Sequence, residues 1–297
     1  MRETATPFDL ARIDAARHVL IAGPTASGKS AFALQIAQAQ GGVVVNADAL
    51  QVWSCWRVLT ARPSASDEAL AEHALYGHVA PGTAYSVGHW LREVGGLLAR
   101  GQRLIVTGGT GLYLSALTEG LAEIPPVPPE TRAEAGARLA QRGLAALLAD
   151  LDPATLARID RANPVRVQRA WEVQAATGRG LAAWQDATPA PLLPLAGATA
   201  LLIETDRDRL AERIEARFAA MLAAGALDEV RAVLGDWNPT APWAQAIGAP
   251  ELVAHLRGAV SLTAATEAAI AATRQYAKRQ RTWFRSRMRD WHKIVGL

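Results

Sequence analysis

Near its N-terminus the chain carries the octapeptide Gly23-Pro24-Thr25-Ala26-Ser27-Gly28-Lys29-Ser30. It matches the pattern G-x-x-x-x-G-K-[ST] and lies between a β-prone run, residues 18–22, and a run with helical apolar spacing, residues 30–40. In this context backbone N–H groups and the positive end of a helix converge on phosphate oxygens. Lys29 would neutralise phosphate charge, and the Ser30 hydroxyl can ligate Mg²⁺. The octapeptide therefore predicts a phosphate-binding loop, without revealing which phosphate compound it holds.

Further apolar runs predict the remainder of the fold. Residues 43–45, 104–107 and 201–203 are expected to be buried strands, and segments with helical periodicity separate them. Strands that alternate with helices are typical of a parallel sheet covered by helices on its faces. Together with the phosphate-binding loop, this order predicts an α/β fold of the P-loop NTPase-like type.

Two proline-rich stretches, residues 125–129 and 189–194, bracket a segment of helical character. Within it Asp152-Pro153 and Asn163-Pro164 each have the form of an N-cap followed by proline at the first helical position, and Gly178 is a suitable helix end. We therefore predict a first part of the core domain over residues 1–125, a helical insertion domain over 126–190, and a second part of the core over 191–297, ending in a basic helix.

Composition excludes several classes of protein. Half of the 297 residues are hydrophobic, which is too many for a disordered chain. The longest nearly apolar stretch, residues 192–203, is interrupted by proline and glycine and is far shorter than the about 20 residues that cross a bilayer. The first 17 residues contain three acids and no apolar block, and Cys55 is the single cysteine. These features predict a cytoplasmic protein without a membrane contact, and the six histidines with Cys55 have no zinc-ligand spacing.

Acidic and glycine-rich segments follow the predicted strands. P-loop enzymes usually have an acid after an apolar strand that holds Mg²⁺. Asp48, after the strand at 43–45, could be this acid, and so could Glu204 or Asp206, after the strand at 201–203. The turn Gly108-Gly109-Thr110 follows a third strand. Ligands bind at the carboxyl ends of such strands, so Asp48 and Thr110 are candidate ligand contacts. Each could instead be an ordinary turn or helix-cap residue.

The C-terminal segment is strongly basic. Residues 274–293 hold eight lysines and arginines and one acid, in a chain of net charge +3. Arg274, Lys278, Arg281 and Arg285 are spaced i, i+4, i+7, i+11, which aligns them on one helix face. Tyr276, Trp283, Phe284 and Trp291 lie among them. Arginines beside aromatic rings suit RNA, although a solvated helix anchored in the core by its aromatic side chains fits the same pattern. The i, i+3 spacing of Arg166 and Arg169 predicts a second basic patch, and charge alone would place Arg217 on the surface.

The motifs GPTASGKS, NADALQ, VTGGTGLY, QAIG and TRQYAKRQRTWFR together resemble the tRNA isopentenyltransferase (IPP transferase) family, over residues 18–285. The resemblance implies transfer of a dimethylallyl group from dimethylallyl diphosphate to N6 of the adenosine on the 3′ side of a tRNA anticodon. The loop would then hold the diphosphate, with Mg²⁺ as cofactor and the anticodon loop of tRNA as partner. We expect a monomer.

The resemblance also implies roles for individual residues. Asp48 would be the general base, Thr110 a contact of the diphosphate bridge, and Arg217 with Lys29 the stabilisers of the departing diphosphate. Gly23, Pro24, Thr25, Ala26, Ser27, Gly28, Lys29 and Ser30 would bind the diphosphate. The tRNA contacts would be Asp48, Ala49, Leu50, Gln51, Thr110, Arg132, Arg166, Arg169, Gln245, Lys278, Arg279, Gln280, Arg281, Trp283 and Arg285.

The chain departs from the family pattern at a few positions. Ala49 replaces a serine, Trp53 a tyrosine, and Ala249-Pro250 an aromatic and a cation. Two alternatives remain at this level. A P-loop kinase could use Asp48 on a small acceptor, and a prenyltransferase could act on free AMP or ADP. Neither needs the basic C-terminal helix or the arginine pair of the insertion.

Overall fold

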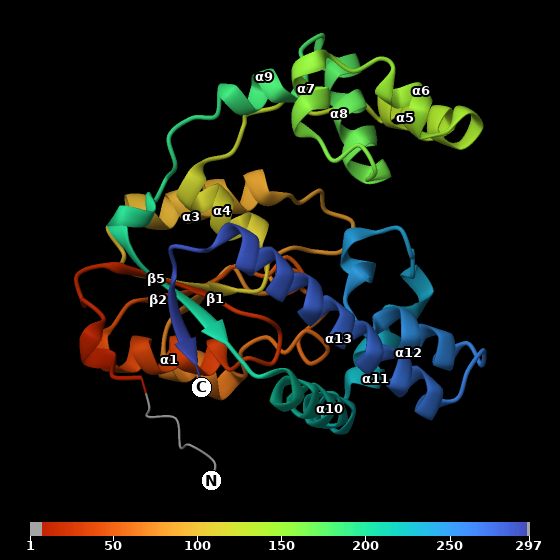
Figure 1. The fold of residues 1–297 in the computed structure, drawn as a ribbon. Coiled ribbons are helices and arrows are strands. Elements are labelled where there is room, and N and C mark those ends of the chain that lie inside the picture. Colours follow the sequence, from red (N-terminus) through yellow and green to blue (C-terminus); the bar gives the residue numbers. More distant parts are fainter. Residues whose placement is uncertain (1–7, 296–297) are drawn as a thin grey trace. The chain divides into compact units, whose positions relative to one another are not determined.

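The structure, a computed structural model, describes residues 8–295 (Figure 1). The chain divides into two compact units, one formed by residues 1–118 and 193–297 and the other by residues 119–192. The chain leaves and re-enters the first unit at one place, where Leu193 N donates to Leu117 O at 3.1 Å. Each unit has its own hydrophobic core and is described by itself below.

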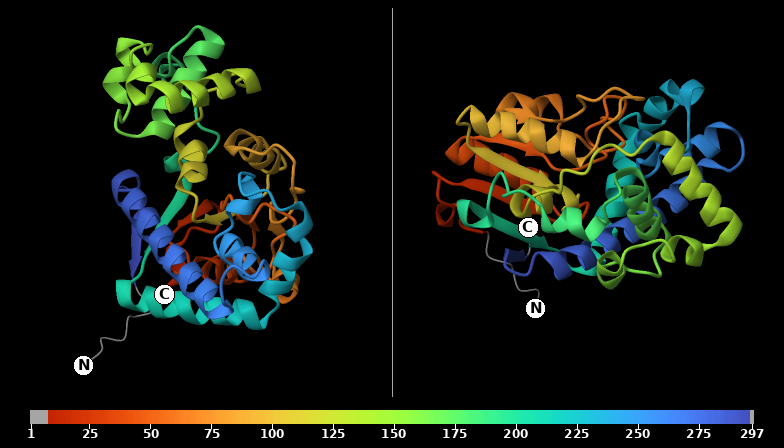
Figure 2. Two further views of the ribbon diagram at one scale, coloured as in Figure 1. Left: turned by 90° about the vertical axis from the view of Figure 1, so that its right-hand side faces the viewer. Right: turned by 90° about the horizontal axis from the view of Figure 1, so that it is seen from above.

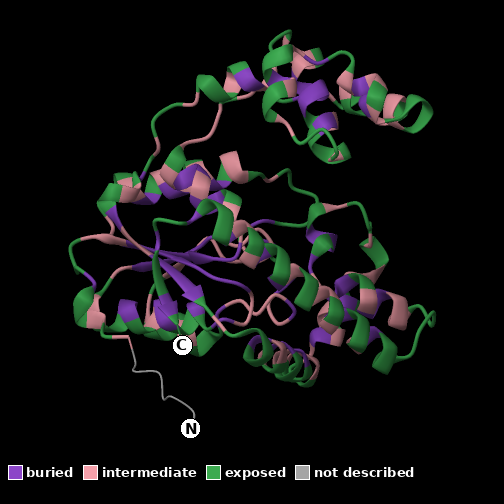
Figure 3. Cartoon of the chain, in the orientation of Figure 1, coloured by how far each residue is buried: buried purple, intermediate pink, exposed green. Residues whose placement is uncertain are grey.

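The first unit is built on a six-stranded sheet in which every strand pairing is parallel. This confirms the predicted α/β class. From one edge to the other the strands are β3 (His73–Ala74), β2 (Val43–Asn46), β4 (Leu104–Gly108), β1 (His18–Ala22), β5 (Ala198–Glu204) and β6 (His292–Val295). The central strands are buried, as Figure 3 shows, which explains why they read as continuous apolar runs.

Alternate side chains of the strands pack against helices on opposite faces of the sheet. Val19 and Ile21 of β1 belong to the core that includes α1 (Lys29–Gln40), whereas Leu20 belongs to the core that includes α3 (Val87–Ala99) and α4 (Gly111–Glu119). The C-terminal part of α13 (Leu262–Arg287) joins this second core through Phe284. The period-2 alternation of a strand thus places helices on both faces.

A group of helices adjoins the sheet on the side of α13. It comprises α10 (Arg207–Ala223), α11 (Ala226–Ala232) and α12 (Ala249–Leu256). One further short helix of the first unit, α2 (Ala65–Leu70), does not belong to this group. α13 runs beside α10 and packs on α12 (Figure 2). Their shared core contains Trp56 and Trp243, with the Trp56 indole N–H donating to Trp243 O at 2.8 Å. This packing brings α10 next to the phosphate-binding loop.

The second unit is entirely helical among its regular elements. Its helices are α5 (Pro129–Arg142), α6 (Leu144–Leu148), α7 (Pro153–Arg158), α8 (Pro164–Thr177) and α9 (Leu181–Asp186). The predicted caps are confirmed. Asp152 accepts from Thr155 N, Asn163 accepts from Arg166 N, and Gly178 ends α8 in the left-handed conformation.

The C-terminal end differs from the prediction that the core ends in a basic helix. α13 ends at Arg287, and the chain then adds β6 to the sheet beside β5. β6 has a single buried residue, Ile294, so it has no apolar run by which a sequence could reveal it. Between residues 8 and 295, no helix is long and apolar enough to span a membrane.

Candidate active site

The phosphate-binding loop joins β1 to α1 as the sequence predicts. Lys29 is the first residue of α1, and Gly28 precedes it with a φ of +93°, a conformation that L side chains rarely adopt. Ser27 N donates to Pro24 O at 3.2 Å and closes the turn. The loop therefore presents backbone N–H groups at the N-terminus of a 12-residue helix, the usual geometry of an anion site.

Asp48 and Thr110 lie at the carboxyl ends of two neighbouring strands, β2 and β4. Thr110 N donates to Ala47 O at 3.1 Å, and Thr110 Oγ1 accepts from Ala49 N at 2.9 Å. Asp48 Oδ1 accepts from Leu50 N at 3.0 Å. The Asn46 side chain bonds Asp48 N and Asp48 O at 2.8 and 3.0 Å. The two turns predicted as ligand contacts are thus bonded to each other.

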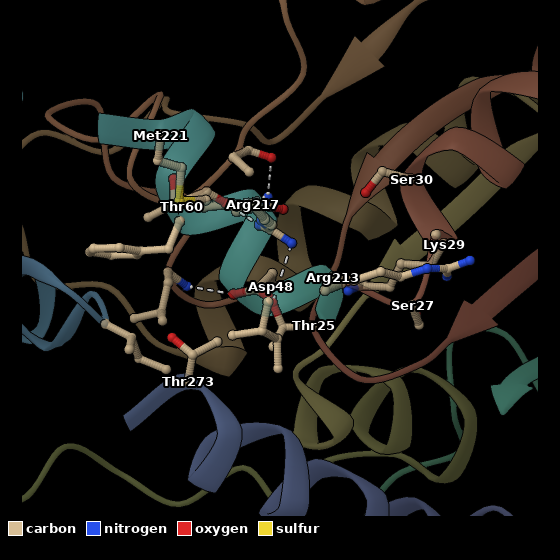
Figure 4. A pocket seen from close by; sticks show the side chains of 18 of the residues that line it. Thr25, Ser27, Lys29, Ser30, Asp48, Thr60, Arg213, Arg217, Met221 and Thr273 are labelled. Carbon is tan, nitrogen blue, oxygen red and sulfur yellow. Dashed lines mark hydrogen bonds between the residues drawn. The ribbon is translucent and has the colours of Figure 1, made fainter. Parts of the chain in front are cut away.

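The phosphate-binding loop and the turn that carries Asp48 border one cavity of about 660 Å³, whereas Thr110, predicted to contact the diphosphate, does not line it. The phosphate-binding loop, Asp48 and Arg217 supply its charged part, whereas apolar side chains supply much of the remaining wall. The lining includes Thr25, Ser27, Lys29, Ser30, Asp48, Leu59, Thr60, Arg217, Phe218, Met221, Ile247, Thr273 and Tyr276. Figure 4 shows Arg217 extending from α10 between Thr25 and Thr60. The predictions brought Lys29, Asp48 and Arg217 together, and the structure places all three on this cavity.

Burial and neighbouring charges alter the two cations of the cavity. The pKa of Lys29 is lowered to about 8: burial is the main cause, the negative charge of Asp48 opposes it, and the positive charge of Arg217 adds to it. Burial also lowers the pKa of Arg217, against the effect of Asp48. Two partly desolvated cations beside one carboxylate leave an excess of positive charge. The cavity is therefore suited to a polyanion.

A loop over residues 57–61 forms part of the wall, and its anchoring was not found from the sequence. The Glu229 carboxylate, on α11, accepts from the backbone N–H groups of Arg57, Val58 and Leu59 at 2.7 to 2.9 Å. Gln51 Nε2 donates to Thr60 O and Ala61 O, both at 2.9 Å. The amide of Gln51, assigned to tRNA in the sequence, is thus used to hold this loop. No pattern in the sequence connects Glu229 to residues some 170 positions earlier.

α13 has a buried face and a basic exposed face. Lys278, Arg279 and Arg285 are exposed, and Arg281 is partly exposed. Phe284 is buried in the core, and Trp283 packs beside it with ring centroids 5.8 Å apart. Gln280 also lies on the buried face, with 5% of its surface exposed. Phe284 and Trp283, whose role the sequence left open, therefore anchor the helix in the core.

A smaller cavity of about 390 Å³ lies on another side of the phosphate-binding loop. Pro24, Arg281 and Arg285 contribute to its wall, together with Glu204 and Asp206. The alternative acids considered from sequence therefore lie apart from the lining of the larger cavity. Arg281 and Arg285 of α13 thus line one cavity with Pro24, the second residue of the phosphate-binding loop.

Four further candidate RNA contacts are exposed, whereas Ala49 and Leu50 are half-buried and Leu50 lines the larger cavity. Arg132, Arg166 and Arg169 are exposed on α5 and α8 of the second unit, and Arg169 is 3.8 Å from Glu172. Gln245 is exposed in the first unit, where its Nε2 donates to Pro239 O at 2.7 Å.

The residues around the cavity fit a cation that takes most of its ligands from a bound substrate and water. Ser30, at the start of α1, supplies an exposed hydroxyl to the wall. Over the described part of the chain, no three His, Cys, Asp or Glu side chains cluster as a metal cage. Mg²⁺ characteristically binds in this way, through few protein ligands and phosphate oxygens.

Comparison with known families gives two matches. The sequence model described as IPP transferase matches residues 51–287, and that described as isopentenyl transferase matches residues 16–73. Together the two cover the phosphate-binding loop, strands β1 to β5, the insertion and all of α13.

Curated relatives and a solved structure agree with these matches. The chain is 66% identical to a tRNA dimethylallyltransferase of Paracoccus denitrificans over 96% of both chains. It is also 66% identical to one from Cereibacter sphaeroides, over 94% of this chain and 88% of the other. A crystal structure of a tRNA isopentenylpyrophosphate transferase from Bacillus halodurans is 28% identical, with a TM-score of 0.67 and coverage of 94% and 90%.

Proposed function

The chain belongs to the IPP transferase family, and we propose that it transfers a dimethylallyl group from dimethylallyl diphosphate to tRNA. The acceptor is N6 of the adenosine on the 3′ side of the anticodon, and diphosphate is released. Because the acceptor is a tRNA, we place the reaction in the cytoplasm. The proposal extends to this chain the activity named for relatives that are 66% identical to it over nearly its full length.

The observation that carries the proposal is the mixed character of one cavity. Its charged part holds the phosphate-binding loop with Lys29 and Arg217, and its wall continues through Leu59, Phe218 and Met221. An allylic diphosphate has this same division between an anionic head and an apolar tail. Residues from the loop, the turn after β2 and α10 thus fit one substrate.

In the reaction, the adenine N6 attacks the allylic carbon C1, and the bond from C1 to the diphosphate oxygen breaks. Asp48 takes the proton that N6 loses. Leu50 N and the Asn46 amide fix the turn that carries the carboxylate. A positioned carboxylate typically contributes about 10²- to 10⁴-fold as a general base.

The departing diphosphate gains negative charge as the bond breaks. Lys29, Arg217 and the N–H groups of the phosphate-binding loop are already directed at the cavity, so they stabilise this charge without reorganisation. Thr110 keeps the Asp48 turn at the edge of the cavity through Ala49 N. Mg²⁺, held by Ser30 and diphosphate oxygens, would supply further charge neutralisation when bound.

The exposed basic residues of α13 and of the insertion bind the tRNA backbone. Lys278, Arg281 and Arg285 share one helix face, and Arg132, Arg166 and Arg169 add cations from the second unit. The adenosine lies in a single-stranded loop, so its extrusion toward Asp48 costs little.

The decisive experiment is incubation with labelled dimethylallyl diphosphate, Mg²⁺ and unmodified tRNA, with AMP as a parallel acceptor. We expect label in the tRNA, mapped to the adenosine beside the anticodon. Label in AMP with none in tRNA would contradict the proposed acceptor. Phosphate transfer from ATP to a small acceptor, without prenyl transfer, would contradict the reaction itself.

A further inference from the structure

Gln280 lies inside the basic segment of α13 but on the opposite side from the basic stripe. Its side chain is buried, with 5% exposed, whereas Lys278 and Arg279 beside it are exposed. A residue in such a segment would ordinarily be taken for an RNA contact. Its burial requires another use for the amide, because buried polar groups need hydrogen-bond partners.

Both ends of the Gln280 amide bond the backbone of the candidate active site. Oε1 accepts from Thr25 N of the phosphate-binding loop at 2.9 Å, and Nε2 donates to Gly109 O, at the end of β4, also at 2.9 Å. The fit at Gly109 is close, since an added Cβ would lie 2.2 Å from Nε2. One side chain thus joins the phosphate-binding loop to the Gly109–Thr110 turn.

The same face of α13 also reaches the turn that carries the proposed base. Tyr276, one helical turn before Gln280, lines the cavity together with Asp48. Thr110, next to Gly109, accepts from Ala49 N, adjacent to Asp48. With Thr25 N on its oxygen and Gly109 O on its nitrogen, the buried Gln280 amide has little surface left to bind a nucleotide.

We propose that Gln280 is a positioning residue that fixes the phosphate-binding loop relative to the Gly109–Thr110 turn, and that it does not contact tRNA. It acts through Thr25 N and Gly109 O. The proposal rests on the proposed prenyl transfer, for which the diphosphate and the base must be held at one distance. The helix that presents cations to tRNA therefore also sets the geometry of the reacting groups.

The test compares Gln280→Met with Gln275→Met. Methionine keeps the length and unbranched shape of glutamine and removes both hydrogen bonds, and Gln275 is an exposed glutamine on the same helix. Three quantities are measured for each: pyrophosphate affinity with Mg²⁺ by calorimetry, affinity for unmodified tRNA by filter binding, and the kcat of prenyl transfer. For Gln280→Met we expect pyrophosphate affinity and kcat to fall about tenfold, with tRNA affinity within twofold of wild type. Gln275→Met should leave all three within twofold.

Gln280→Glu provides a second test that depends less on packing. A carboxylate can still accept from Thr25 N but cannot donate to Gly109 O, so kcat should fall while tRNA affinity holds. At a true RNA contact, the added negative charge would repel phosphates and weaken tRNA binding severalfold.

Three results would overturn the proposal. Loss of tRNA affinity with unchanged pyrophosphate affinity would make Gln280 an RNA contact. Wild-type values for Gln280→Met would make its amide dispensable. Equal losses of pyrophosphate affinity and tRNA affinity in Gln280→Met and Gln280→Glu would indicate a general effect on the fold. A wild-type protein that binds pyrophosphate and tRNA but transfers no prenyl group would instead count against the proposed function.

Discussion

Arg217 and Thr25 are 192 positions apart in sequence, and the Arg217 Nη1 donates to the Thr25 hydroxyl at 3.3 Å. Nη2 of the same guanidinium lies 3.5 Å from Thr60 O. The arginine is therefore held between the phosphate-binding loop and the 57–61 loop, at the charged part of the cavity. A planar guanidinium has donors at fixed angles, and this arrangement uses two of them.

Arg217→Lys should show whether this geometry matters. Lysine keeps the positive charge but cannot direct donors at Thr25 and Thr60 together. We expect kcat to fall about 10²- to 10³-fold, as when one preorganised charge-stabilising donor is lost, with little change in tRNA affinity. Steady-state kinetics with saturating tRNA measure the effect. Arg213→Lys, one helical turn earlier on the same cavity wall, is the comparison; equal losses in both would remove any special role of Arg217.

Asp48→Asn should abolish most turnover and spare substrate binding. The amide oxygen can still accept from Leu50 N, so the turn is retained, but the side chain no longer takes a proton. We expect kcat to decrease by about 10²- to 10⁴-fold. Single-turnover transfer and filter binding of tRNA are the measurements. A variant that turns over at the wild-type rate would exclude Asp48 as the base.

The lowered pKa of Lys29 predicts a dependence of diphosphate affinity on pH. Below its pKa of about 8 the free enzyme carries the charged ammonium, and above it the proton is lost and binding weakens by up to about tenfold per pH unit. Calorimetric titration with pyrophosphate from pH 7 to 9.5 measures this change. Pyrophosphate itself also titrates, so Lys29→Arg, which stays charged throughout, serves as control. If the arginine variant shows the same decline, the decline belongs to the ligand and not to Lys29.

The basic stripe of α13 should set the salt dependence of tRNA binding. Replacing Arg285 by alanine removes an exposed cation and should reduce the slope of log affinity against log salt by about 0.7 to 0.9. Arg287→Ala is the matched control, because Arg287 is exposed on the same helix but lies off the stripe. Filter binding at several salt concentrations gives both slopes. Identical slopes for the wild type and Arg285→Ala would assign Arg285 no phosphate contact.

Glu229→Ala should destabilise the fold through the loop it holds. Three backbone N–H groups, at Arg57, Val58 and Leu59, lose their acceptor. We expect a decrease of about 3 kcal/mol in the free energy of unfolding, measured by urea denaturation. The adjacent Asp228→Ala removes an exposed ion pair with Arg231 and should change stability by less than about 1 kcal/mol. Similar effects of the two substitutions would show that the three bonds contribute little.

The sequence predicts those parts of the molecule that depend on local patterns. The phosphate-binding loop, the buried strands, the caps of α7 and α8, and the position of Asp48 after β2 all follow from residues close together in the chain. Strand ends of a parallel sheet share an edge, so the proximity of Asp48 and Thr110 could also be inferred.

The remaining features depend on contacts between distant segments. The packing of α11 brings Glu229 to the backbone of residues 57–59. Nothing in the sequence distinguishes an acid that binds a distant loop from any other acid on an amphipathic helix. Gln280 occupies a run of cations, so its surroundings in sequence suggest RNA, whereas its rotation about the helix axis turns it inward. β6 escapes prediction because an edge strand with one buried side chain resembles a polar tail.

Residues 119–192 form an insertion whose two ends are held together by the hydrogen bond between Leu193 N and Leu117 O. The backbone that enters the insertion and the backbone that leaves it are therefore paired within the first unit. Insertions, deletions or wholesale exchange within residues 119–192 therefore need not alter the register of the sheet or the spacing of the turns beside the substrate. With the arginines of this segment binding tRNA as proposed, the choice of RNA and the chemistry of transfer can evolve at separate rates within one polypeptide.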